Sequence, residues 1–241
     1  MNYLELNEEA NEYRRKWGID EYAPIDIFSV ILNKIQNITI AFIDANEKLS
    51  GSCLDLKNQK VIFINTKHSL GRQRFTAAHE LYHLHFNKKT FMTCSTDIKI
   101  QKEKDADQFA SCLLLPHGAL RKYEDENNIS KWDLTNIIKA EQYFQISHKT
   151  LLRRLLFLKK ITIKEYKQFL PNIKKNASKI GYPINLYTPF TNKEIVMGNY
   201  IKLLTKAWDT QKISKGKMAE LLLDAFYEDY FFNRDMEDLS E

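Results

Sequence analysis

The spacing of apolar positions predicts helices and strands in the first half of the chain and helices alone in the second. Helical segments repeat apolar residues every three or four positions, and Pro24 suits the start of the second one. Three short runs rich in β-branched residues predict strands, the last two joined as a hairpin. The predicted helices cover residues 4–17, 24–35, 70–87, 102–115, 130–144, 148–158, 192–208 and 214–232, and the predicted strands cover residues 38–43, 51–56 and 60–65.

The change of pattern after Gly118 suggests how the chain is organised. No strand pattern follows this point, and residues 181–190, which contain glycine and proline, have the composition of a connector. We therefore expect an α+β fold, in which a small sheet with active-site helices is followed by an all-helical C-terminal region. The predicted units are residues 1–120, a helical segment 121–180 with a helix-turn-helix rhythm, and a C-terminal region 181–241.

Composition and charge exclude several classes of protein. The chain has 241 residues, 44% of them hydrophobic, and a formal net charge of +5, which permits a nucleic-acid partner without requiring one. Cys53, Cys94 and Cys112 are odd in number and far apart, so they suit neither a disulfide framework nor a thiolate zinc cage. We find neither a signal peptide nor an apolar run of the roughly 20 residues that span a bilayer. A cytoplasmic protein without a membrane partner is expected.

The strongest chemical signal is the run HELYH at residues 79–83. His79 and His83 are one helical turn apart, so both imidazoles leave the same face of the predicted helix and can reach one metal ion. Glu80 lies about 100° around the helix, where it can take a proton from water without binding the metal. Small and apolar residues surround the run, which favours a buried site over a surface pair of histidines. This pattern is typical of a zinc-dependent metalloprotease with one Zn²⁺ ion.

A catalytic zinc site needs a third protein ligand. His85 points about 200° away from His83, so we reject it. Glu103 starts the next predicted helix after a connection long enough to fold back, and Asp107 shares its face. Asp107 could accept the outer N–H of a ligand histidine. A solvated acidic turn at a helix start is the alternative for these two residues. Given the HELYH run, we prefer the ligand interpretation.

These segments together resemble the ImmA/IrrE family of metallopeptidases. The chain has RFTAAHELYH at residues 74–83, EKDADQFA at 103–110 and LLLP at 113–116. The family pattern is approximately R-F-T-x-A-H-E-x-x-H, E-x-x-A-N-x-F-A and L-L-M-P. The resemblance covers about residues 20–120, with a weaker echo to residue 160. Two positions depart mildly from the pattern: Asp107 stands where asparagine is common, and Leu115 where methionine is common.

The resemblance implies a zincin-like fold and specific roles for the site residues. His79, His83 and Glu103 would bind zinc, and Glu80 would act as the general base. The implied substrate is a helix-turn-helix repressor or an antitoxin-like regulator, and genes for such proteases often lie on phages and mobile elements. The alternative is a non-proteolytic transcriptional or stress regulator that binds DNA or a partner and retains the zinc site. The intact Glu80 favours the protease.

Two features of the site remain open at the level of sequence. The strand at residues 60–65 could hold a substrate as an added strand if it forms a sheet edge, but it could equally be an ordinary core strand. No residue can be assigned to stabilise the oxyanion, since Tyr82 and His85 are close to the HELYH run only in sequence number.

The basic segment after residue 148 has two interpretations. Residues 130–160 have the rhythm of a helix-turn-helix, which would present Lys149, Arg153 and Arg154 to DNA. The alternative is a packed helical pair whose basic residues face solvent. We favour the packed pair because the net charge of the whole chain is modest. The apolar residues of the helices after residue 190 predict core packing rather than a surface for a partner.

Overall fold

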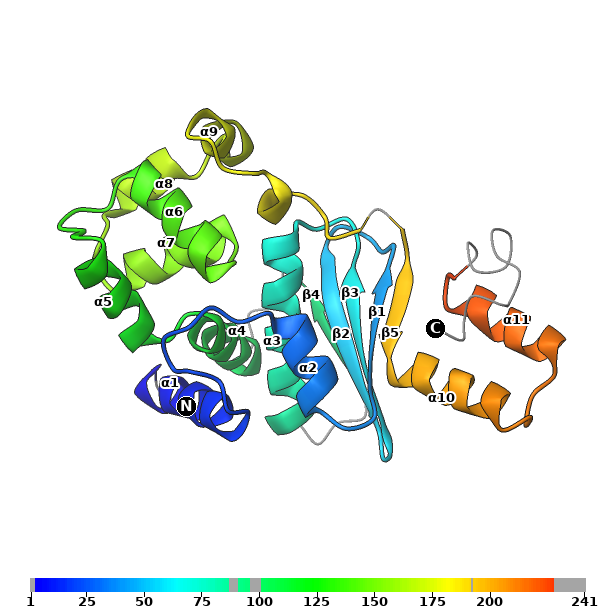
Figure 1. The fold of residues 1–241 in the computed structure, drawn as a ribbon. Helices are drawn as coiled ribbons and strands as arrows, with labels where there is room; N and C mark the ends of the chain where they lie inside the picture. Colours follow the sequence, from blue (N-terminus) through cyan, green and yellow to red (C-terminus); the bar gives the residue numbers. More distant parts are fainter. Residues whose placement is uncertain (1–2, 87–90, 96–100, 192, 228–241) are drawn as a thin grey trace.

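The computed structural model describes residues 3–86, 91–95, 101–191 and 193–227 (Figure 1). Within these ranges, five strands form one sheet in the order β4-β2-β3-β1-β5. The strands are β1 Ile38–Ile43, β2 Leu49–Leu56, β3 Gln59–Asn65, β4 Phe91–Ser95 and β5 Ile195–Gly198. The helices are α1 Tyr3–Lys16, α2 Ile27–Lys34, α3 Leu70–Phe86, α4 Gln101–Leu114, α5 His117–Glu126, α6 Leu134–Phe144, α7 His148–Phe157, α8 Ile163–Phe169, α9 Ile173–Lys179, α10 Asn199–Asp209 and α11 Lys215–Asp224, with a short 3₁₀ helix η1 at Asn185–Tyr187.

The mixed α+β composition is as expected, and the elements that carry the site lie where the sequence places them. α3 starts at its predicted residue and ends one residue early, and α4 starts and ends one residue earlier than predicted. α2 begins at Ile27, three residues later than expected, with Asp26 rather than Pro24 preceding it. The predicted hairpin forms between β2 and β3, with Cys53 opposite Ile62.

The prediction of an all-helical C-terminal region is wrong at β5. This four-residue strand pairs antiparallel with β1, where Ile40 lies opposite Met197. α10 consequently starts at Asn199 instead of residue 192. Four residues are too few to display an alternating pattern, and the free edge of β1 supplies the hydrogen-bonding partners that make them a strand. Residues 228–232 of the last predicted helix lie outside the described residues, and the division at residues 120 and 180 stays a prediction.

The sheet also corrects the expectation for residues 60–65. β3 runs parallel to β1 on one side and antiparallel to β2 on the other. Both of its edges are therefore occupied, so β3 cannot accept an added strand. The edge strands of the sheet, as far as the structure describes it, are β4 and β5.

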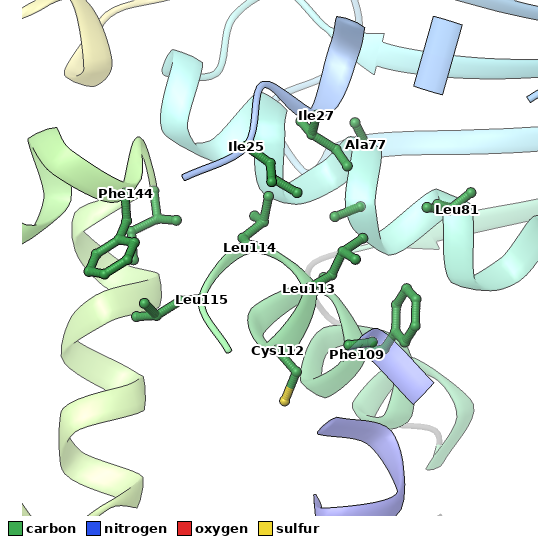
Figure 2. Close-up of a cluster of buried hydrophobic side chains, with 14 of the residues drawn as sticks. Ile25, Ile27, Ala77, Leu81, Phe109, Cys112, Leu113, Leu114, Leu115 and Phe144 are labelled. Atoms are coloured by element: carbon green, nitrogen blue, oxygen red, sulfur yellow. The ribbon is translucent and has the colours of Figure 1, made fainter. Parts of the chain in front are cut away.

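Helices α1 to α4 lie on one side of the sheet, with α2 and α3 against it, whereas α10 and α11 lie beyond β5 (Figure 1). α3 contacts β2 and β3, and α4 packs between α3 and α1. One apolar core links these layers to the following helices, from Ala77 and Leu81 of α3 through Leu113 of α4 to Phe144 of α6 (Figure 2). All four side chains are at most 3% exposed. The core thus fixes α3 against α4 and against the α6–α7 pair. No helix in the described ranges is long and apolar enough to cross a membrane.

Two buried arginines hold the C-terminal end of α4. The last four carbonyls of a helix have no partner within it. Arg14, which is fully buried, donates from Nη1 to the Leu113 carbonyl at 2.7 Å. Arg154 donates from Nη2 to the Leu115 carbonyl at 3.1 Å and is only 3% exposed. Arg154 therefore serves the packing of α7 on α4, and its burial withdraws it from any DNA surface.

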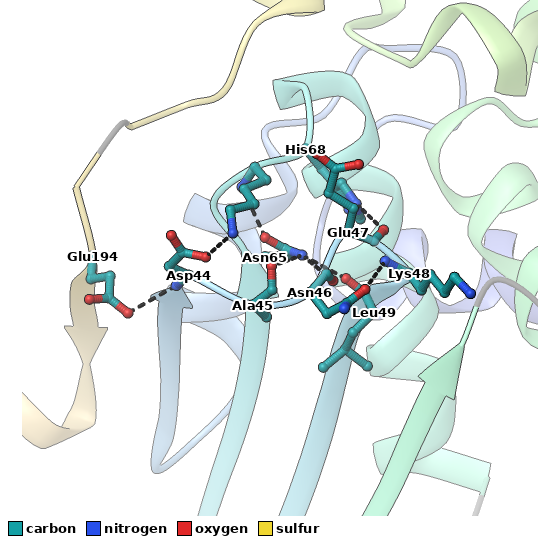
Figure 3. Close-up of polar contacts among 10 residues, drawn as sticks. Asp44, Ala45, Asn46, Glu47, Lys48, Leu49, Asn65, His68 and Glu194 are labelled. Atoms are coloured by element: carbon teal, nitrogen blue, oxygen red, sulfur yellow. Dashed lines mark hydrogen bonds and ion pairs between the residues drawn. The ribbon is translucent and has the colours of Figure 1, made fainter.

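The loop between β1 and β2 is tied down by one side chain (Figure 3). Asn65 Nδ2 donates to the carbonyls of Asn46 and Leu49 at 2.9 and 2.8 Å, and Asn65 is 1% exposed. His68 Nε2 lies 3.0 Å from the Glu47 carbonyl of the same loop. Because this loop leads directly into β2, these bonds set the position at which β2 crosses α3.

Candidate metal centre

The two histidines of the HELYH run face each other across one turn of α3. His79 Nε2 lies 3.1 Å from His83 Nε2, and the side chains are 9% and 0% exposed. The side of the helix that faces the core is small or apolar, and Ala77, Ala78 and Leu81 are buried there. Packing of that side leaves the two imidazoles directed toward α4.

Glu103 of α4 completes a group of three ligand-type side chains. Its Oε2 lies 3.1 Å from His79 Nε2, and its Oε1 lies 3.4 Å from His83 Nε2. One possible ligand atom from each of His79, His83 and Glu103 lies within 4.8 Å of the others, and all three residues are buried. The sequence-based candidates are therefore brought together, and their role as ligands remains a prediction.

The chemistry of this group fits a divalent cation. Two imidazole nitrogens and a carboxylate converge, so lone pairs oppose one another unless a proton or a metal ion lies between them. Burial lowers the pKa of His79, but its contacts with Asp107 and Glu103 outweigh burial and raise the pKa to about 10 in the absence of metal. The surroundings thus strongly favour positive charge at this point. Two nitrogens and one carboxylate oxygen match the protein ligands of a catalytic zinc site.

Asp107 contacts the Nδ1 side of the His79 ring. Its Oδ1 is 2.9 Å from His79 Nδ1. When Nδ1–H donates to this carboxylate, the lone pair of Nε2 points into the cluster, which is the tautomer that a metal requires. Asp107 is half exposed, in contrast to Glu103. This contact can orient the His79 ring, and the role of Asp107 at a metal site remains a prediction.

Glu80 is fully buried beside the cluster, where β2 crosses α3. A Cβ atom on Gly51 would lie 2.4 Å from Thr76 Cγ2, 2.6 Å from the Phe63 carbonyl and 3.4 Å from Glu80 Oε1. Only glycine allows this close approach of strand and helix. Burial and the nearby Glu80 carboxylate both raise the pKa of the Cys53 thiol, which keeps it neutral. Sequence reasoning missed Gly51, although a glycine inside a strand pattern signals a close backbone approach.

His85 and Tyr82 take no part in the cluster. The His85 ring packs edge-on against Tyr13, with ring centroids 4.9 Å apart. Tyr82 is 5% exposed, and its ring packs on Phe109, with centroids 5.5 Å apart. The rejection of His85 as a ligand agrees with this geometry. Neither residue lines the cavity at the cluster, as far as the described residues define it.

A cavity of about 740 Å³ opens at the cluster. His79, Glu80 and Glu103 form part of its wall, which α3 and α4 provide at this end. The opposite wall comes from α7 and η1, which the sequence did not associate with the site. The cavity is large enough to admit a segment of peptide chain to the cluster.

Comparisons with known proteins identify the family of the chain. A search of curated proteins finds no match. One similar solved structure is a Mycobacterium tuberculosis transcriptional regulator, with 14% sequence identity and a TM-score of 0.46. The alignment covers 63% of this chain and 46% of that one, so this chain spans less than half of the regulator. The family described as Peptidase_M78, IrrE N-terminal-like domain, matches residues 33–156, which include β1 to β4 and the cluster of His79, His83 and Glu103. The chain belongs to this family, the ImmA/IrrE metallopeptidases.

Proposed function

We propose that the protein is a zinc-dependent endopeptidase. The observation that carries the proposal is the convergence of His79, His83 and Glu103, with Glu80 buried next to them, at the end of a cavity. Membership of a peptidase family supports it. A site that only held the fold together would need ligands but no additional buried carboxylate. The presence of Glu80 therefore supports hydrolysis over a purely structural metal.

In this proposal, His79, His83 and Glu103 hold one zinc ion. When bound, zinc supplies Lewis acidity, which polarises a carbonyl group and makes water more acidic. Glu80 takes the proton of the attacking water and returns it to the leaving amine. Asp107 holds the His79 ring in the orientation required for binding. The cavity walls exclude bulk water and orient the peptide.

An edge strand offers a way to hold the substrate. β4 forms the sheet edge next to β2, and β2 carries Gly51 against Glu80. A peptide that adds to β4 would gain main-chain hydrogen bonds while lying near the cluster. We assign this role to β4 in place of β3, because both edges of β3 are paired.

We further propose that the substrate is a helix-turn-helix repressor or an antitoxin-like regulator, cleaved in the cytoplasm. This proposal comes from the resemblance to the ImmA/IrrE family. The natural candidate is the product of a neighbouring gene, if that gene encodes a small helix-turn-helix protein.

The test is to incubate the zinc-loaded protein with that candidate and to follow cleavage by mass spectrometry. Cleavage that a chelator stops and zinc restores is expected. Glu80→Gln should bind zinc normally and cleave at least about 100-fold more slowly, the contribution expected of a general base. Cleavage by Glu80→Gln at the wild-type rate would overturn the proposed mechanism.

A further inference from the structure

We propose that the cavity contains a cationic subsite, formed by Arg72, Lys149 and Arg153, that binds an acidic side chain of the substrate about three residues from the scissile bond. This inference rests on the proposed peptidase function, and it adds a sequence preference to that function. All three basic residues line the same cavity as the metal cluster.

Arg72 lies on the same face of α3 as the histidines of the cluster. Positions 72, 76, 79 and 83 follow the helical repeat, so their side chains leave α3 within about 60° of one another. Arg72 is seven residues before His79, which corresponds to about 10 Å along the helix axis. An extended peptide advances about 3.3 Å per residue, so three residues span this distance. This spacing sets the predicted position of the acidic residue.

Lys149 and Arg153 reach the cavity because α7 packs closely on the start of α3. A Cβ atom on Gly71 would lie 2.8 Å from Ser147 Cα and 2.9 Å from Ser147 N. The absence of a side chain at Gly71 therefore lets the first turn of α7 lie next to Arg72. Lys149 and Arg153 are four residues apart, so both point from one face of α7.

A buried network fixes α7 in this position. Glu141 of α6 receives a hydrogen bond at Oε2 from the Tyr187 hydroxyl at 2.9 Å. Its Oε1 lies 2.5 Å from His148 Nδ1, and His148 Nε2 lies 3.0 Å from the Phe169 carbonyl. His148 is the first residue of α7, so the contacts join the start of that helix to α6, α8 and η1. The cations on α7 thus project from a rigid wall.

No carboxylate of the described residues pairs with the cations of the subsite, Arg72, Lys149 and Arg153. Arg72 donates a hydrogen bond to Ser50 Oγ at 2.8 Å. Arg72 and Arg153 line the same cavity, and burial together with the positive charge of Arg153 lowers the pKa of Arg72. A carboxylate between them would relieve this repulsion.

The chemistry of the cavity favours a carboxylate on a peptide over the backbone of a nucleic acid. Glu80, Glu103 and Asp107 line the other end of the same cavity and would repel a chain of phosphates. A peptide with one acidic side chain places a single negative charge at the cationic end. Its neutral backbone meets the metal cluster.

The experiment uses peptide hydroxamates, which bind zinc without being cleaved, and isothermal titration calorimetry with the zinc-loaded protein. Each compound carries glutamate or glutamine at the second, third or fourth residue from the hydroxamate and ends in an amide. Two series, with the hydroxamate at either end, cover both sides of the scissile bond. At one position, near the third residue, glutamate should bind about tenfold more tightly than glutamine.

Substitutions of the subsite arginines test whether these side chains cause the preference for glutamate. Arg72→Gln and Arg153→Gln should each lose most of the preference for glutamate while binding the glutamine compounds as wild type does. Arg153→Glu should instead favour a compound with lysine at that position. Arg121→Gln is the matched control, because Arg121 is exposed on α5 and lies outside the cavity. It should keep the full preference.

Three results would overturn the inference. Equal affinity for glutamate and glutamine at every position is the first, and a preference that survives in both arginine-to-glutamine variants is the second. The third is that a free C-terminal carboxylate improves binding while the glutamate side chain does not. If no hydroxamate binds, the zinc site fails and the subsite fails with it. If hydroxamates bind but the repressor is not cut, the proposed proteolysis fails, and the ratio of glutamate to glutamine affinity still decides on the subsite.

Discussion

The two ends of the cavity differ in charge, burial and origin. At the metal end, the side chains of His83 and Glu103 are nearly inaccessible to solvent. They come from α3 and α4, which are successive helices in the sequence. At the other end, Lys149 and Arg153 are exposed and come from α7. This helix is distant from α3 in the sequence and lies next to it in the folded structure. Carboxylates gather around the histidines at the first end, and cationic side chains gather at the second.

The difference in burial determines how strongly a substitution at each end should affect the protein. A buried group of polar atoms pays a large desolvation cost if its partner is lost, whereas exposed charges interact weakly through water. Changes at the metal end should therefore be nearly all-or-none. Changes at the cationic end should alter the preference among substrates and leave the chemistry in place.

The largest expected effect is the loss of zinc when a ligand is removed. His83→Ala and Glu103→Ala should each abolish stoichiometric zinc binding, because a catalytic site has only three protein ligands. Metal analysis after dialysis measures this. His85→Ala is the matched control; since His85 packs against Tyr13, this variant should keep its zinc. Full zinc content in both ligand variants would contradict the assignment of His83 and Glu103 as zinc ligands, and with it the distinction between the two ends.

A smaller effect is expected at Asp107, which contacts the cluster only through His79. Asp107→Ala should weaken zinc binding about 10- to 100-fold, the range for residues that orient a ligand. Asp107→Asn keeps an oxygen that can accept from His79 Nδ1, so it should bind zinc more tightly than the alanine variant. Competition with a fluorescent zinc chelator gives both affinities. Equal affinity of wild type and Asp107→Ala would remove Asp107 from the site.

At the junction of the two ends, Gly71→Ala should disturb the cationic wall and spare the metal. The new methyl group collides with the backbone at Ser147, which costs about 1–3 kcal/mol of stability. Urea unfolding measures the loss of stability, and the hydroxamate titration should show a reduced preference for glutamate with unchanged zinc content. Gly216→Ala on α11 meets no atom closer than 4.0 Å and should not lower stability. Equal stabilities of the two variants would contradict the close packing of α7 on α3.

The smallest effect is that of salt. Exposed charges are screened within about 8 Å at physiological ionic strength, so the preference for glutamate should fall as salt is raised. The affinity of the glutamine compounds, which depends on zinc, should change little over the same range. A glutamate preference that is independent of salt would mean that a buried group, and not Lys149 and Arg153, binds the glutamate side chain.

The metal end was predictable from sequence because its geometry is local. The spacing of His79 and His83 fixes their relation on any helix, and Glu103 starts the next predicted helix. The strands β1, β2 and β3 were equally visible, since their β-branched runs carry their own pattern. The catalytic roles at this end remain predictions for experiment.

The cationic end could not be predicted because its geometry depends on packing between distant segments. Lys149 and Arg153 appeared in the sequence as part of a basic stretch, with DNA or solvent as the alternatives. The close packing of Ser147 on Gly71 and the buried contacts of His148 with Glu141 and Phe169 turn them toward the cavity. β5 was missed for the same reason, since its partner β1 lies more than a hundred residues earlier.

The most direct test of the central claim is X-ray absorption at the zinc edge on the purified protein, with the metal content measured on the same sample. We predict one zinc ion per chain, with two imidazole nitrogens and oxygen ligands at about 2.0 Å and no sulfur. The signal should disappear in His83→Ala. A zinc ion bound by sulfur, or a spectrum unchanged in His83→Ala, would contradict the assignment of His79, His83 and Glu103 as the metal site.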